Sequence, residues 1–137
     1  MTRKHWICLI IVGIIYAVVG IGFGEIAKRV PVDQSRAWRL GAWVASAAVY
    51  AGHFGYEQFR IEQRSLKVAL HAAIAVGIGG FLLAVAAGAH AIFIGSQAQL
   101  WLYGVALIAW PIFTGVPAFV VTLVASALLT RLRAAGK

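Results

Sequence analysis

The chain has 137 residues, of which 62% are hydrophobic, and it carries a formal net charge of +8. Its mean hydropathy is +0.88, whereas soluble domains are only about half apolar, so an ordinary soluble domain is excluded. The basic residues gather at the ends of apolar runs, as in membrane proteins, and no basic run is interleaved with aromatic residues as nucleic-acid binding requires. We therefore expect no nucleic-acid partner.

Four apolar stretches occupy most of the chain, and each is long enough to cross a hydrocarbon core, which takes about 20 residues of helix. They are Trp6–Ile26, Ala37–Tyr56, Val68–Ala91 and Leu100–Leu129. A backbone in lipid must satisfy its own hydrogen bonds, and continuous apolar runs do not fit the alternating strands of a barrel. The predicted fold is all-α, a polytopic membrane protein whose single domain, 1–137, is an antiparallel bundle of four transmembrane helices in the lipid bilayer.

The first stretch carries small residues at steps of four, three and four, namely Gly13, Ala17, Gly20 and Gly24. Residues at these steps share one face of a helix, and small side chains allow two membrane helices to approach closely. This face is predicted to pack against another helix, which can belong to the same chain, to a second copy or to a partner membrane protein.

The second stretch carries a polar stripe, because Tyr50, His53 and Glu57 follow one another at steps of three and four. His71 lies about one helical turn inside the third stretch, so antiparallel packing would bring it to the depth of His53. Ser126 of the fourth stretch can join them. Ionisable groups inside a membrane are costly, so these five residues are the candidate site.

Three interpretations of this cluster compete. In the first it is structural: His53 bonds to Tyr50 or to a carbonyl, and Glu57 pairs with Arg60 or Lys67. In the second, His53 and His71 ligate a metal or a haem, although no metal-ligand spacing accompanies them. In the third, the cluster handles a proton or a solute, since histidine titrates near neutral pH.

The last stretch is longer than one crossing requires, and it contains Pro111 and Pro117, so we expect a kink. Hydroxyl residues at multiples of four from Thr114 to Thr130 can satisfy carbonyls that the prolines free. His5 and His90 lie near the ends of stretches and are predicted to be interfacial.

Outside the four stretches or at their ends, lysine and arginine number eight on the side that holds both termini and the second loop, and four on the other side. Positive residues favour the cytoplasm, so both termini are predicted to be cytoplasmic, in a bacterial inner membrane.

The sequence contains no catalytic signature, neither a nucleophile turn nor a phosphate loop, so no enzyme activity is expected. A single cysteine, Cys8, excludes an internal disulfide, and no metal or cofactor is assigned. The predicted function is a structural, interaction or assembly component that packs through its small-residue faces as a homo-oligomer or with a membrane-protein partner. The alternatives are a small transporter or proton-linked channel that uses the His/Glu cluster, and then a bis-His haem redox module.

Overall fold

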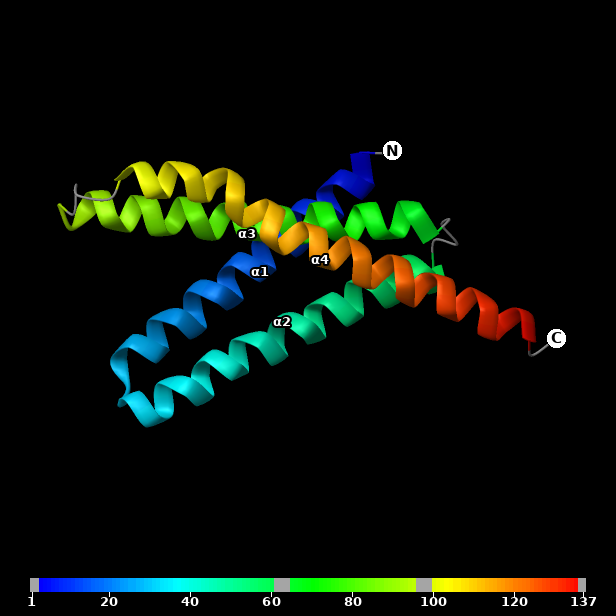
Figure 1. Ribbon diagram of the computed structural model, residues 1–137, viewed down its shortest axis with the longest axis horizontal. Coiled ribbons are helices and arrows are strands. Elements are labelled where there is room, and N and C mark those ends of the chain that lie inside the picture. Colours follow the sequence, from blue (N-terminus) through cyan, green and yellow to red (C-terminus); the bar gives the residue numbers. More distant parts are fainter. Residues whose placement is uncertain (1–2, 61–64, 96–99, 136–137) are drawn as a thin grey trace.

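The computed structural model describes residues 3–60, 65–95 and 100–135, and these residues form four α-helices (Figure 1). The helices are α1 (Arg3–Arg29), α2 (Val32–Arg60), α3 (Ser65–Phe93) and α4 (Leu100–Ala135). The all-α class is confirmed, and the helices extend past the predicted apolar stretches, because polar residues at a helix end continue the backbone hydrogen bonds. Arg64 and Lys137, which enter the count of positive residues, lie outside the described residues.

Three of these helices are long and apolar enough to cross a membrane, counted over the described part of the chain. They comprise residues His5–Arg29, Ser65–Phe93 and Leu100–Leu132. α2 is not among them, because Arg36, Arg39 and Glu57 reduce its apolar character. Four helices are present, as expected, and three of them have the length and composition of a membrane span.

The helices form two antiparallel hairpins, α1–α2 and α3–α4, which meet near one end and diverge toward the other (Figure 1). In the first hairpin, the rings of Phe23 and Trp38 lie 5.8 Å apart near the turn. Helices α1 and α3 run in the same direction, since Gly13 lies against Ile78 and Gly20 lies against Leu83. The bundle is thus joined mainly by α3, which packs on both α1 and α4.

Two adjacent glycines allow α3 to take this central position. A Cβ at Gly79 would lie 2.6 Å from the Cβ of Tyr16 on α1, and a Cβ at Gly80 would lie 2.6 Å from Oγ1 of Thr114 on α4. No real Cβ tolerates such distances, so both contacts require glycine. One helix therefore packs at backbone distance against two neighbours, as small residues permit in membranes.

The small-residue face of α1 divides between two environments. Gly13 and Gly20 contact α3, and Ala17 is buried. A Cβ at Gly24 would meet nothing within 4 Å among the described residues. Three of the four small residues therefore pack inside the bundle, whereas Gly24, near the turn between α1 and α2, makes no close helix contact among the described residues.

Helix α4 continues through both prolines and changes direction where its ribbon passes from yellow to orange (Figure 1). Thr114 donates to the carbonyl of Trp110 at 2.9 Å, and Thr122 donates to that of Ala118 at 2.7 Å. A proline frees a different carbonyl, the one four residues before it. The hydroxyls of Thr114 and Thr122 therefore do not satisfy the freed carbonyls, contrary to the prediction from the sequence. They bond to carbonyls that already have helical partners.

Candidate functional site

The converging end of the bundle contains a buried acid. Glu57, near the end of α2, is 2% exposed, and its Oε2 lies 3.1 Å from Nδ1 of His71, near the start of α3. His71 is itself 5% exposed. The connection between α2 and α3 is short, so these two residues meet at the same end of the bundle. A carboxylate out of contact with water needs such a partner, because an unpaired charge in the interior is strongly unfavourable.

Further polar groups surround this pair. The ring of His5, at the start of α1, lies 5.9 Å from the ring of His71, centroid to centroid. On α2, His53 lies one turn before Glu57 and Gln58 directly follows it, and both are buried. Three helices therefore contribute to a polar cluster, which we define as His5, His53, Glu57, Gln58 and His71.

Ser126 of α4 is fully buried at the corresponding level. Helices α2 and α4 run in the same direction, because each is antiparallel to one of the parallel helices α1 and α3. Tyr50 contacts Thr122, and Ser126 follows Thr122 by one turn as His53 follows Tyr50. Its hydroxyl has no hydrogen-bond partner among the described residues, and neither has Nε2 of His53. An unpartnered buried polar atom costs about 1–3 kcal/mol, so this end of the bundle retains unused hydrogen-bonding capacity.

Tyr50 does not bond to His53. Its hydroxyl donates to the carbonyl of Ala118 at 2.9 Å and also contacts Oγ1 of Thr122, which is fully buried. Tyr50 therefore links α2 to α4, about two turns away from Glu57. The sequence places the two on one stripe, but the structure gives them separate partners.

Sequence reasoning omits three residues of this region from the candidate site. Thr122 carries a signal, because it stands in the series of hydroxyl residues along α4. The sequence predicts only an interfacial position for His5, but its ring on α1 contacts the ring of His71 on α3. Gln58 is buried although it lies off the polar stripe of α2. These two placements depend on helix rotation, which the spacing within one helix does not reveal.

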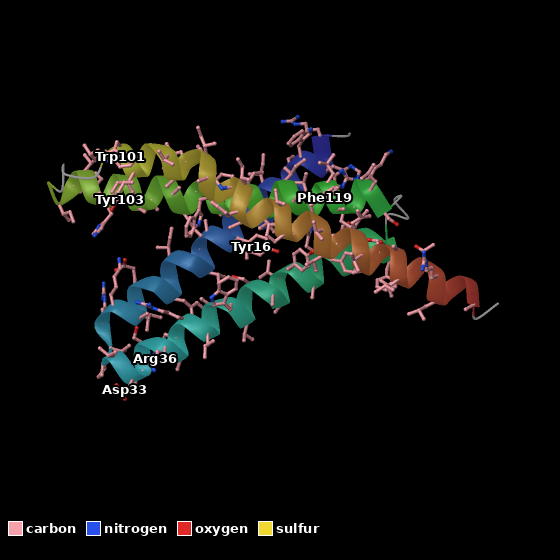
Figure 2. The ribbon with its side chains drawn as sticks, in the orientation of Figure 1. Tyr16, Asp33, Arg36, Trp101, Tyr103 and Phe119 are labelled. Atoms are coloured by element: carbon pink, nitrogen blue, oxygen red, sulfur yellow. The ribbon has the colours of Figure 1, made fainter. Side chains whose placement is uncertain are left out.

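A cleft of about 500 Å³ lies between the two hairpins, and all four helices line it. Its walls are apolar and aromatic, with Trp43 from α2 and Trp110 and Phe113 from α4. Tyr16, about midway along α1 (Figure 2), also lines the cleft and is 8% exposed. Its hydroxyl has no hydrogen-bond partner among the described residues.

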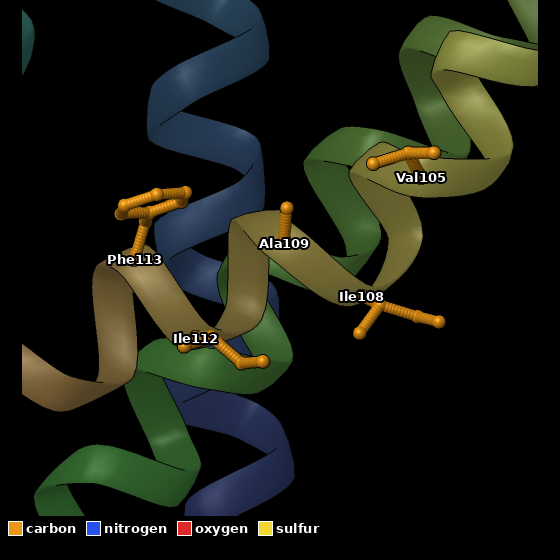
Figure 3. Close-up of a pocket in the computed structure, with 5 residues that line it drawn as sticks. All are labelled: Val105, Ile108, Ala109, Ile112 and Phe113. Atoms are coloured by element: carbon orange, nitrogen blue, oxygen red, sulfur yellow. The ribbon is translucent and has the colours of Figure 1, made fainter.

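A second hollow, of about 380 Å³, lies on α4 alone (Figure 3). Its five lining side chains are all apolar: Val105, Ile108, Ala109, Ile112 and Phe113. Because one helix cannot enclose a ligand and no polar group orients one here, this hollow is part of the apolar outer surface.

No group of three or more His, Cys, Asp or Glu side chains suited to a metal ion occurs within the described ranges. The chemistry available to the polar cluster is proton exchange between a carboxylate and imidazoles. Comparisons with protein families, with curated proteins and with solved structures found no match to this chain.

Proposed function

We propose that the chain crosses a bacterial inner membrane four times, with α2 as one crossing and both termini in the cytoplasm. The directions of the helices support this topology. Helices α1 and α3 run in the same direction, so the chain must return across the membrane between them, and α2 is the connection.

The matched lengths of α1 and α2 also support a crossing by α2. Phe23 contacts Gly41 at one end, while His5 and Glu57 both contact His71 at the other. Between these ends α1 advances about 27 Å and α2 about 24 Å, at 1.5 Å per residue. The two helices therefore traverse the same depth.

The side chains of α2 are arranged for lipid despite its average composition. Leu40, Trp43 and Val44 are 66%, 77% and 70% exposed, whereas His53 and Glu57 are buried. A soluble protein avoids so large an exposed apolar surface, and a membrane helix turns its polar residues inward. Orientation of the termini rests on the positive-residue count of eight against four.

Within that topology, the protein acts as a small proton-linked transporter, with Glu57 as the group that gains and loses the proton. The buried Glu57–His71 contact carries this proposal. An acid inside a membrane protein is expensive to maintain, and a functional role is the default explanation. His71 can accept the proton from Glu57 or return it, and His53 offers a further imidazole on the same helix as Glu57.

Infrared spectroscopy of the reconstituted protein tests the proton step. Titration across pH should reveal a protonated carboxyl band that disappears in Glu57→Gln, while Glu25→Gln, at an exposed ion pair with Lys28, retains it. If no band changes with pH, or if Glu57→Gln retains it, Glu57 does not exchange a proton.

A second candidate is the structural or assembly role, through contact with a second copy or a partner protein. It is favoured by exposed small residues on the outer face of α2, where a Cβ at Gly52 would meet nothing within 4 Å and Ala48 is exposed. Gly52→Leu should then reduce the oligomeric mass measured in detergent. An unchanged mass would assign this face to lipid.

A further inference from the structure

We propose that the cleft between the hairpins binds a neutral, lipophilic ring compound that bears a carbonyl oxygen, a molecule of the quinone class. This site is separate from the polar cluster, and it does not depend on proton exchange at Glu57. Its volume of about 500 Å³ lies within the range of small-molecule pockets, roughly 300–1,000 Å³.

Among the hydrogen-bonding groups that line the cleft, Tyr16 is the most deeply buried donor without a partner, since Ser46 is only half-buried and the indoles of Trp43 and Trp110 are exposed. Tyr50 donates to Ala118, and Thr114 donates to Trp110 and Pro111. The hydroxyl of Tyr16 is more than nine-tenths buried and has no partner among the described residues. A buried donor without an acceptor is unfavourable, so the ligand should offer an acceptor to Tyr16.

The depth of Tyr16 determines the kind of acceptor. It lies 13 residues after Arg3, about 20 Å along α1, near the middle of the crossing. The ester groups of a phospholipid stay at the membrane surface, so an acyl chain brings no acceptor to this depth. A lipophilic carbonyl compound does, and it keeps its oxygen within the hydrocarbon.

The walls determine the shape and charge of the ligand. Trp43, Trp110 and Phe113 line the cleft and are 77%, 50% and 74% exposed, so they stand at its mouth on the lipid side. Aromatic side chains pack favourably on a flat ring. The lining includes no Asp, Glu, Lys or Arg, which favours a neutral molecule that enters from the hydrocarbon.

The test uses the full chain in nanodiscs and a benzoquinone with a decyl tail as the probe, with quenching of tryptophan fluorescence as the readout. Wild type should bind saturably. Tyr16→Phe retains the ring that packs on Gly79 and should weaken binding about five- to tenfold, the effect of one lost hydrogen bond. Decylbenzene, which lacks the carbonyl, should not compete.

A matched pair of variants locates the binding. Ala47 lines the cleft and Ala48 does not, and both are exposed on α2. Ala47→Phe should abolish saturable binding, while Ala48→Phe should leave it unchanged. The proposal is overturned if quenching is non-saturable, if decylbenzene competes equally, or if Tyr16→Phe and Ala47→Phe both bind as wild type does. Because Glu57→Gln should bind the probe normally, failure here is distinguishable from failure of the proton-linked role.

Discussion

Helices α2 and α3 both have 29 residues, but they meet their surroundings in opposite ways. α3 is apolar over most of its length, lies at the centre of the bundle and buries small residues such as Ala75, Gly79 and Gly80. α2 lies at the side, buries His53 and Glu57, and exposes its tryptophan and aliphatic residues. Of these two helices, only α3 has the composition of a membrane span.

The difference shows that average hydropathy and membrane compatibility are separate properties. The lipid contacts only the outer face of a helix, so α2 can tolerate charged residues if neighbouring helices cover them. α3 has neighbours on two sides, and its composition is set by the need for small side chains at those contacts. Four experiments test this comparison, from the largest expected effect to the smallest.

The first asks whether α2 crosses at all. In a Cys8→Ala background, single cysteines replace Val32 at the start of α2 and Leu66 at the start of α3, which are 79% and 61% exposed. A membrane-impermeant maleimide applied to intact cells should label position 32 and not position 66, because a crossing separates the ends of α2. Labelling of both positions would place α2 on the membrane surface.

The second tests the glycine contacts of α3. Gly79→Ala places a Cβ 2.6 Å from the Cβ of Tyr16, whereas at Gly88 the nearest atom, Cβ of Tyr103, is at an ordinary 3.5 Å. Overpacking costs about 1–3 kcal/mol, so Gly79→Ala should lower the melting temperature in detergent. Gly88→Ala should hold or raise it, since alanine favours helix by up to ~1 kcal/mol. Equal melting temperatures would show that α1 and α3 do not pack this closely.

The third compares buried and exposed acids. Glu57→Ala leaves His71 without its carboxylate partner in the interior, and we expect a loss of about 1–3 kcal/mol in unfolding free energy. Glu25→Ala removes an exposed ion pair with Lys28 and should cause no measurable change. Denaturation followed by tryptophan fluorescence measures both, and similar losses would contradict the burial of Glu57.

The fourth concerns the link from α2 to α4. Tyr50→Phe removes a donor to the carbonyl of Ala118 and should cost about 0.5–1.5 kcal/mol. Tyr56→Phe is the control, because Tyr56 is 54% exposed. The same denaturation assay applies, and a Tyr50→Phe protein as stable as the control would show that this hydrogen bond adds nothing.

The helical class, the approximate helix positions and the spacing of polar residues on α2 could all be predicted from the amino-acid sequence. These follow from local rules, since a lipid-embedded backbone must form helix and a repeat of three and four residues falls on one face. Tyr50, His53 and Glu57 are on the stripe that the sequence predicts, and the small residues of α1 lie on one face for the same reason.

Which partners these faces meet became known only from the packing of the four helices. Glu57 contacts His71, His5 joins them from α1, and Tyr50 bonds to α4. A Cβ at Gly24 would meet nothing within 4 Å among the described residues. The reason is that α3 and α4 present apolar residues on all sides over most of their length, and lipid tails are as apolar as leucine. Hydropathy therefore does not fix the rotation of such helices, and close packing at glycines together with the pairing of buried polar groups selects it instead.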